Sequence, residues 1–329
     1  MNQLDNLLTD LEKFCHKYPG PAPWTVQFKG ERHQKHLVFG AITHGNETGS
    51  LPAFLDIFKL LEKGELSFGG KLTFFFGNVA AAKAGKRFLE KDLNRVFTDN
   101  PQESREERRA QELMPILKVA DLFVDFHQTI LDSKQPFYIF PYHTSGYQWA
   151  RVLQGARNLV TRSPKYKFSE KSVCADEYAR NHGVPGITLE MGQSGFSELA
   201  YNATRSTIER GIAYMEEIAS GTSLEQILEK AASPELRFFE ITYTQPFSDP
   251  HMALASGYVN FESIEGGHTL GVSDANNTPL IAPKSGQILF PKYPQRDSTG
   301  AAIAPFPAEI YNLATSFKQH PSDRYRDDI

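Results

Sequence analysis

Apolar residues recur along most of the chain with the spacing of helices and buried strands. In residues 1–20, leucines and a phenylalanine recur every three or four positions, as in an amphipathic helix, and Tyr18-Pro19-Gly20 ends the pattern. Short apolar runs then alternate with longer amphipathic stretches. They predict strands over residues 24–28, 36–42, 72–76, 121–126, 137–140 and 186–190. They predict helices over residues 48–62, 104–119, 146–159, 172–181 and 199–219.

This alternation of strands and helices predicts an α/β fold with a mixed or parallel sheet flanked by helices. The pattern changes after Ala232-Ser233-Pro234, where short alternating runs over 238–243 and 287–290 are separated by Gly, Pro, Asn and Asp. We therefore expect an α/β domain over residues 1–233 and a small all-β domain over 234–329. The polar end of the chain, residues 320–329, is expected to fray.

Composition places the chain among soluble globular proteins. Its 329 residues are 40% hydrophobic and 22% charged. No run of eighteen apolar residues predicts a membrane span, and the N-terminus lacks the apolar segment of a secretory signal. The two cysteines, Cys15 and Cys174, are too few for a disulfide framework or a thiolate metal cluster. A cytoplasmic protein fits these features best.

Charge limits the partners. The formal net charge of -4 provides no bulk attraction for nucleic acid or an anionic membrane, and we expect neither as a partner. Any anionic ligand must therefore meet a local cluster of positive charge. The sequence leaves open whether the chain forms a homo-oligomer.

The sharpest local motif is His44-Gly45-Asn46-Glu47, which directly follows an apolar strand. Its position predicts an imidazole at the carboxyl end of the strand and a carboxylate in the first turn of the next helix. This pair has the chemistry of two zinc ligands. Taken alone, the motif is better explained by a polar loop histidine and a glutamate that complements the helix dipole.

A second histidine follows another predicted strand in Val124-Asp125-Phe126-His127. It supplies a third ligand, although a lone histidine is more often a satisfied, half-buried side chain. Asp125 lies two residues earlier on the same side of the strand and can orient an imidazole. Two histidines and a glutamate are a set found in hydrolytic zinc sites.

Glu190 ends the apolar run Pro185-Gly186-Ile187-Thr188-Leu189. A carboxylate in such a strand is costly unless it is paired or used, so Glu190 is the candidate general base. A buried ion pair with an arginine is the alternative.

Positive charge gathers between residues 78 and 97. Arg87 can polarise a scissile carbonyl, while Asn94 and Arg95 can hold a carboxylate. Arg180 precedes the strand of Glu190 and can supply a second carboxylate clamp. The alternative for residues 78–97 is a solvated surface loop with a helix cap at Asp92.

Together these motifs resemble the succinylglutamate desuccinylase/aspartoacylase family over roughly residues 37–195. The family consists of zinc hydrolases with a carboxypeptidase-like catalytic domain and a smaller C-terminal β domain. The four motifs occur in the family's order: His44-Gly45-Asn46-Glu47-Thr48, Asn78 to Arg95, Asp125-Phe126-His127 and Leu189-Glu190-Met191-Gly192.

The resemblance implies a role for each matching residue. One zinc ion per chain is implied, with His44, Glu47 and His127 as its ligands. Glu190 is implied as general base and Arg87 as carbonyl polariser. Asn94, Arg95 and Arg180 match positions that hold substrate carboxylates. A tyrosine of the C-terminal domain enters the aspartoacylase pocket, and Tyr293 and Tyr311 are the two candidates for it here.

The sequence departs from the family pattern at positions that bear on the choice of substrate. Leu131 stands where succinylglutamate desuccinylases tend to have an arginine, and Gln128-Thr129-Ile130 replaces the Asn-Thr-Thr frequent in aspartoacylases. Phe126 for the usual leucine is a mild apolar change. The resulting expectation is a zinc-dependent amidohydrolase that acts on an N-acyl amino acid with acidic groups. A zinc carboxypeptidase for short peptides and a non-catalytic dicarboxylate-binding protein are the alternatives.

Overall fold

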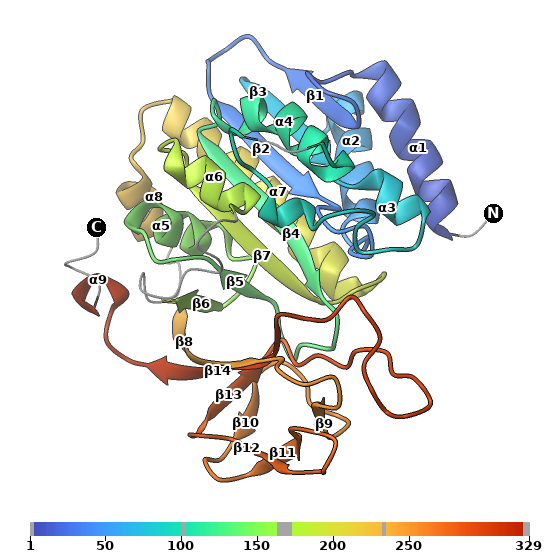
Figure 1. Ribbon diagram of the computed structural model, residues 1–329. Coiled ribbons are helices and arrows are strands. Elements are labelled where there is room, and N and C mark those ends of the chain that lie inside the picture. Colours follow the sequence, from blue (N-terminus) through green and yellow to red (C-terminus); the bar gives the residue numbers. More distant parts are fainter. Residues whose placement is uncertain (1–2, 101–102, 163–172, 232–234, 325–329) are drawn as a thin grey trace.

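The computed structural model describes residues 3–100, 103–162, 173–231 and 235–324. A large mixed sheet runs through the molecule, with helices on both faces of its N-terminal part (Figure 1). Its strands lie in the order β1-β3-β2-β4-β7-β5-β6-β8-β14-β13-β10, and a second sheet has the order β12-β11-β9. Strands β3, β2, β4 and β7 are mutually parallel, so their carboxyl ends lie along one edge.

The elements alternate as the sequence pattern predicts. The strands are β1 (Thr25–Lys29), β2 (His36–Ala41), β3 (Lys71–Phe76), β4 (Leu122–Thr129), β5 (Phe137–Ile139), β6 (Asn158–Arg162), β7 (Gly186–Gln193), β8 (Arg237–Pro246), β9 (Ala253–Leu254), β10 (Glu262–Ile264), β11 (Thr269–Val272), β12 (Pro279–Ile281), β13 (Gly286–Leu289) and β14 (Glu309–Phe317). The helices are α1 (Gln3–Lys17), α2 (Leu51–Lys63), α3 (Val79–Lys83), η1 (Leu93–Arg95), α4 (Arg105–Leu117), α5 (Thr144–Leu153), α6 (Ala175–Asn181), α7 (Glu198–Ala219), α8 (Leu224–Lys230) and α9 (Pro321–Arg324). None of these described helices is long and apolar enough to cross a membrane.

Side-chain alternation along the central strands builds two cores. On β4, Val124 and Phe126 belong to the larger core, which helices α1, α2, α5 and α7 cover. Phe123 points to the other face and packs under α4 and α6. Asp125 and His127 follow Phe123 at two-residue intervals, so they project to the α4/α6 face and are fully or almost fully buried.

The α/β prediction is confirmed, and each predicted strand and helix named above has a counterpart. The helix expected over 146–159 is wrong in its second half: α5 ends at Leu153, and Asn158–Arg162 forms strand β6. Gln154 takes a left-handed conformation that ends the helix. The β-branched Val160 and Thr161 then pair with β5 and β8.

The C-terminal strands continue the main sheet. Strand β8 pairs with β6 on one side and with β14 on the other, so the sheet is unbroken across the predicted boundary at residue 233. Residues 232–234 and 325–329 lie outside the described residues, and division into two domains stays a prediction. Residues 320–329 were expected to fray, but Pro321–Arg324 form helix α9, and Arg324 is paired with Glu240.

His36, at the start of β2, gives a test of this packing. Burial lowers the pKa of His36 to about 4, and its Nε2 lies 2.8 Å from the Thr73 hydroxyl. The unfolded chain therefore binds more protons between pH 6.5 and about 4, so stability falls as the pH falls through this range. We expect His36→Gln to reduce the slope of unfolding free energy against pH there, measured by urea denaturation with chelator present. An unchanged slope would count against a buried neutral histidine.

Candidate metal centre and active site

The three predicted metal ligands come from two segments that the parallel sheet brings together. His44 and Glu47 lie in the loop between β2 and α2, and His127 lies on β4. Glu47 precedes the helix instead of occupying its first turn as predicted, because α2 begins only at Leu51. His127 is within the strand, which extends three residues beyond its predicted end. All three side chains are buried.

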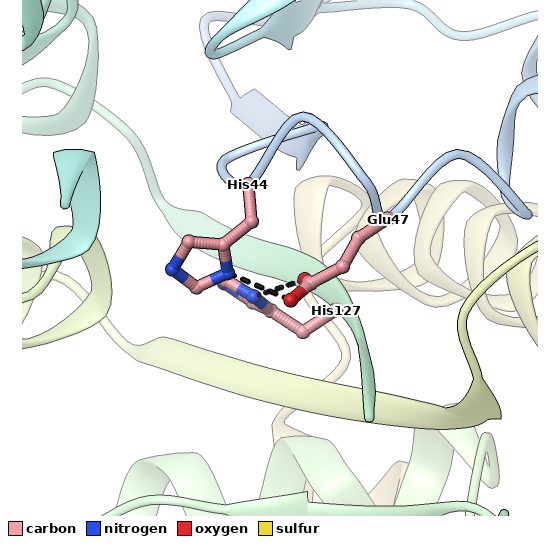
Figure 2. A group of neighbouring side chains, drawn as sticks. All are labelled: His44, Glu47 and His127. Carbon is pink, nitrogen blue, oxygen red and sulfur yellow. Dashed lines mark hydrogen bonds and ion pairs between the residues drawn. The ribbon is translucent and has the colours of Figure 1, made fainter. Parts of the chain in front are cut away.

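The Glu47 carboxylate bridges the two imidazoles (Figure 2). Its Oε1 lies 2.8 Å from His44 Nδ1, and its Oε2 lies 2.8 Å from His127 Nδ1. One ligand atom from each residue falls within 4.8 Å of the others. The backbone N–H of Gln128 also donates to Glu47 Oε2 at 3.2 Å. Two nitrogens and a carboxylate oxygen thus converge in a buried site.

Each imidazole has a second carboxylate on its far side. His44 Nε2 lies 2.9 Å from Asp92 Oδ1, and His127 Nε2 lies 2.9 Å from Asp125 Oδ2. The prediction that Asp125 orients an imidazole is confirmed, and the Thr43 hydroxyl donates to Asp125 at 3.0 Å. When each Nε2 carries the ring proton, each Nδ1 lone pair is free for a cation. This arrangement is typical of histidine metal ligands.

The charges around Glu47 favour its ionised form. Burial alone raises the pKa of this carboxyl, but His44 and His127 hold it well below its usual value. Asp125 and Glu47 in turn hold the pKa of His127 well above normal, against the effect of burial. A divalent cation would replace the protons as the positive partner of Glu47. The donor set therefore fits a metal such as zinc.

Glu190 lies beside His127, because the two residues are register partners on β7 and β4. Burial raises the pKa of Glu190 to about 7. Its Oε2 has no hydrogen-bond partner among the described residues. The charge of Arg87 acts on Glu190, but its guanidinium is paired with Glu47. The buried arginine ion pair considered for Glu190 is therefore not formed in the described part of the chain. A buried, unpartnered carboxyl that titrates near neutrality suits proton transfer.

Arg87 reaches the site from the stretch between α3 and η1. Its Nη1 donates to Glu47 Oε1 at 2.9 Å, and its Nη2 lies 2.8 Å from His44 Nε2. About a third of the side chain remains exposed. Arg87 therefore lies where the ligand set opens toward solvent.

Asn94 and Arg95 are close to this centre but are already engaged. Asn94 Oδ1 accepts the Ala175 N–H at 2.9 Å, at the start of α6. Arg95 donates to the Asn94 carbonyl at 2.7 Å, and its charge acts on Asp92. Asp92 is the cap of η1, as predicted, and through His44 it joins this group to the ligands.

The hydrogen bonds of Arg180 lie away from the candidate metal ligands. It donates to Asp176 Oδ2 at 2.6 Å and to the Gly186 carbonyl at 2.8 Å, which fastens α6 to the start of β7. Its suggested role as a carboxylate clamp stays a prediction.

The C-terminal strands contribute charge that sequence reasoning missed. Lys292 and Glu309 form an ion pair, and burial together with the charges of Arg87 and Arg95 lowers the pKa of Lys292. Glu309 and Arg95 also act on Arg162, whose pKa burial lowers to about 10. No local motif marks these residues. Arg162 is on β6, Lys292 lies between β13 and β14, and Glu309 is on β14, so they come together only in the folded sheet.

The two candidate tyrosines occupy other places. Tyr311 is fully buried in the core of the C-terminal strands. The Tyr293 hydroxyl donates to the Ala255 carbonyl at 2.8 Å and accepts the Tyr258 N–H at 3.1 Å. These contacts of Tyr293 and Tyr311 include none of the three candidate metal ligands, and entry of either tyrosine into the pocket stays a prediction.

The side chain of Gln128, noted only as a departure from the family pattern, fastens the ligand segments. Its Oε1 accepts the Gly49 N–H at 2.8 Å, and its Nε2 donates to the Gln193 carbonyl at 2.7 Å. The exit of β7 is thereby tied to the loop that carries Glu47. Its position directly after His127 was the only sequence signal for this function.

A fold of this kind, with a histidine and carboxylate centre at the carboxyl ends of its strands, has counterparts among known proteins. Residues 33–218 match the family model described as the succinylglutamate desuccinylase/aspartoacylase catalytic domain. The chain belongs to this hydrolase family. It is 25% identical over 294 residues to succinylglutamate desuccinylase of Ectopseudomonas mendocina, covering 84% of this chain and 85% of that one.

Solved structures share the fold. Succinylglutamate desuccinylase from Vibrio parahaemolyticus superposes with a TM-score of 0.66 and 18% identity, covering 90% of this chain and 87% of that chain. Murine aminoacylase 3 superposes with a TM-score of 0.61 and 19% identity, covering 87% and 96%. These similarities confirm the mixed α/β architecture with its C-terminal strands.

Asp92 and Asp125, the carboxylates on the far side of the two imidazoles, are expected to affect metal affinity. We expect Asp125→Asn to weaken zinc binding by about 10- to 100-fold, because an amide orients the His127 imidazole less well than a carboxylate. Chelator competition measures this change. Asp121→Asn, just before the same strand, is the control and should keep the original affinity. Equal affinities in both variants would contradict the assignment.

Proposed function

We propose that the chain is a zinc-dependent hydrolase that cleaves the amide bond of an N-acyl amino acid with acidic groups. The observation that carries the proposal is the position of Glu190. This carboxyl lies in register beside His127, is buried, and has an oxygen without a partner among the described residues. Membership of a hydrolase family supports the same reaction class.

His44, Glu47 and His127 would hold the zinc ion, one per chain. A bound zinc ion supplies Lewis acidity, which polarises a carbonyl and makes water a stronger acid. Asp92 and Asp125 keep the imidazoles oriented for this function.

Glu190 and Arg87 would then transfer the proton and stabilise the negative charge of the reaction. Glu190 accepts a proton from the attacking water and returns it to the leaving amine, for which a pKa near 7 is well matched. The Arg87 guanidinium stabilises the negative charge that develops on the acyl oxygen. Its contact with Glu47 places this positive charge beside the ligand set before substrate arrives.

Charge at the opening supports an acidic substrate. Arg87, Arg95 and Lys292 lie within electrostatic reach of one another, and each can pair with a carboxylate. Asp92 and Glu309 offset part of this charge. The charges of Arg87 and Arg95 act on Lys292, which lies between β13 and β14. A C-terminal segment this near the opening favours a small substrate over a peptide.

A hydrolysis panel tests the proposal. N-acetyl-aspartate, N-succinyl-glutamate, N-succinyl-arginine and short peptides are incubated with zinc-loaded and chelated protein. We expect zinc-dependent release of an amino acid from at least one acidic N-acyl substrate. Cleavage of peptides alone would identify a carboxypeptidase, and binding without any product would identify a dicarboxylate-binding protein.

The two catalytic assignments predict separate losses. Glu190→Gln should lower kcat by about 100- to 10,000-fold, because it removes the general base. Arg87→Ala should lower kcat by on the order of 100-fold, because it removes an oxyanion partner. Steady-state kinetics measure both, with zinc content checked. Lys83→Ala removes a cation from nearby α3, where Lys83 lies over the Trp24 ring, and should keep full turnover.

A further inference from the structure

Glu106 is a buried carboxylate for which the proposed reaction has no direct use. It lies in the first turn of α4 and is only 2% exposed. It faces residues 84–92, which connect α3 to η1 and carry Arg87; we call them the Arg87 loop. No helix or strand forms in this loop, so its conformation depends on contacts with its neighbours.

The Glu106 carboxylate accepts hydrogen bonds from three successive backbone N–H groups of the Arg87 loop. Oε1 accepts from Leu89 at 2.8 Å, while Glu90 and Lys91 donate to Oε2 at 3.3 and 3.2 Å. Oε1 also accepts from Asn78 Nδ2 at 3.0 Å, at the start of α3. Burial alone raises the pKa of Glu106, but these donors hold it below its usual value. The ionised form therefore fits the site.

Two further contacts fix the same loop. The Glu90 carboxylate accepts the Arg105 N–H at 2.8 Å, so loop and helix start hold each other. The Arg87 carbonyl accepts the Gly45 N–H at 2.8 Å, beside His44. A side chain at Gly45 would collide with the Lys86 carbonyl, which shows how closely the two segments approach. The loop is thus fixed at Arg87 itself and at residues 89–91.

We propose that Glu106 is a positioning residue that holds the Arg87 loop in the shape that places the Arg87 guanidinium beside Glu47 and His44. This proposal depends on the role of Arg87 in hydrolysis that is proposed above. Glu106 touches neither the ligands nor Arg87, and it acts through the backbone of residues 89–91. Its single buried carboxylate meets several N–H donors at once.

Glu106→Gln tests the proposal with little change of shape. The glutamine amide places N–H donors against the backbone donors of the loop, so at least one donor loses its partner. Glu107→Gln is the matched control. Glu107 is the next residue and is also buried; its carboxylate accepts from the Lys91 side chain and from Ser104 at its own helix cap, whereas the carboxylate of Glu106 accepts from the loop backbone. We expect kcat of Glu106→Gln to fall about 10- to 100-fold below that of Glu107→Gln, with KM nearly unchanged.

A double-mutant cycle separates positioning from general damage. If Glu106 acts through Arg87, then Glu106→Gln causes little further loss of kcat in the Arg87→Ala background. Losses that multiply in the double variant, or equal kcat values for the two glutamine variants, would overturn the proposal. Should Glu106→Gln fail to fold, Glu106→Asp and Glu107→Asp replace the pair, because withdrawing the carboxylate by one methylene weakens the same contacts.

Hydrogen exchange gives a readout that needs no activity. We expect faster amide exchange across residues 87–91 in Glu106→Gln than in Glu107→Gln, with zinc content equal in both. Unchanged exchange would overturn the positioning function even if hydrolysis is observed. Faster exchange in a protein that hydrolyses none of the panel would support Glu106 as the anchor of the loop and reject the proposed function alone.

Discussion

Parallel pairing of β2, β4 and β7 is the constraint on which the candidate site depends. It brings the exits of three strands to one edge, so the loop after β2 can place His44 and Glu47 against His127. The same pairing sets Glu190 beside His127. Because side chains alternate along each strand, the polar groups share the α4/α6 face while Val124 and Phe126 fill the opposite core. A one-residue shift of β4 would move His127 into that core.

Burial makes the charges of this centre depend on one another. Glu47 is ionised because two imidazoles flank it, and His127 retains its proton because Asp125 and Glu47 accept from it. Removing one partner leaves a buried charge without compensation, which is far more costly than losing a surface pair. A bound cation would satisfy the same balance of charge. Arg87 adds positive charge from a loop that α4 holds in place.

Several features were predictable because local pattern dictates them. The strand ending at Ala41 and the buried strand carrying Asp125 follow from apolar runs, and their polar residues had to be paired or used. The second half of the helix expected over 146–159 was wrong, because pairing with β5 and β8 outweighed its weak helical periodicity. Lys292 was missed because its neighbours at the site are distant in sequence.

The sequence by itself determined the order of strands and helices, the α/β class and the residue types that converge on a metal-like centre. These features follow from periodicity and from the cost of burying polar groups, which act locally. Only the tertiary structure decided that Arg180 donates to the Gly186 carbonyl, that Gln128 fastens two loops and that Glu106 accepts from the backbone of the Arg87 loop. Each depends on which backbone groups meet in space, and that is set by strand pairing and helix packing.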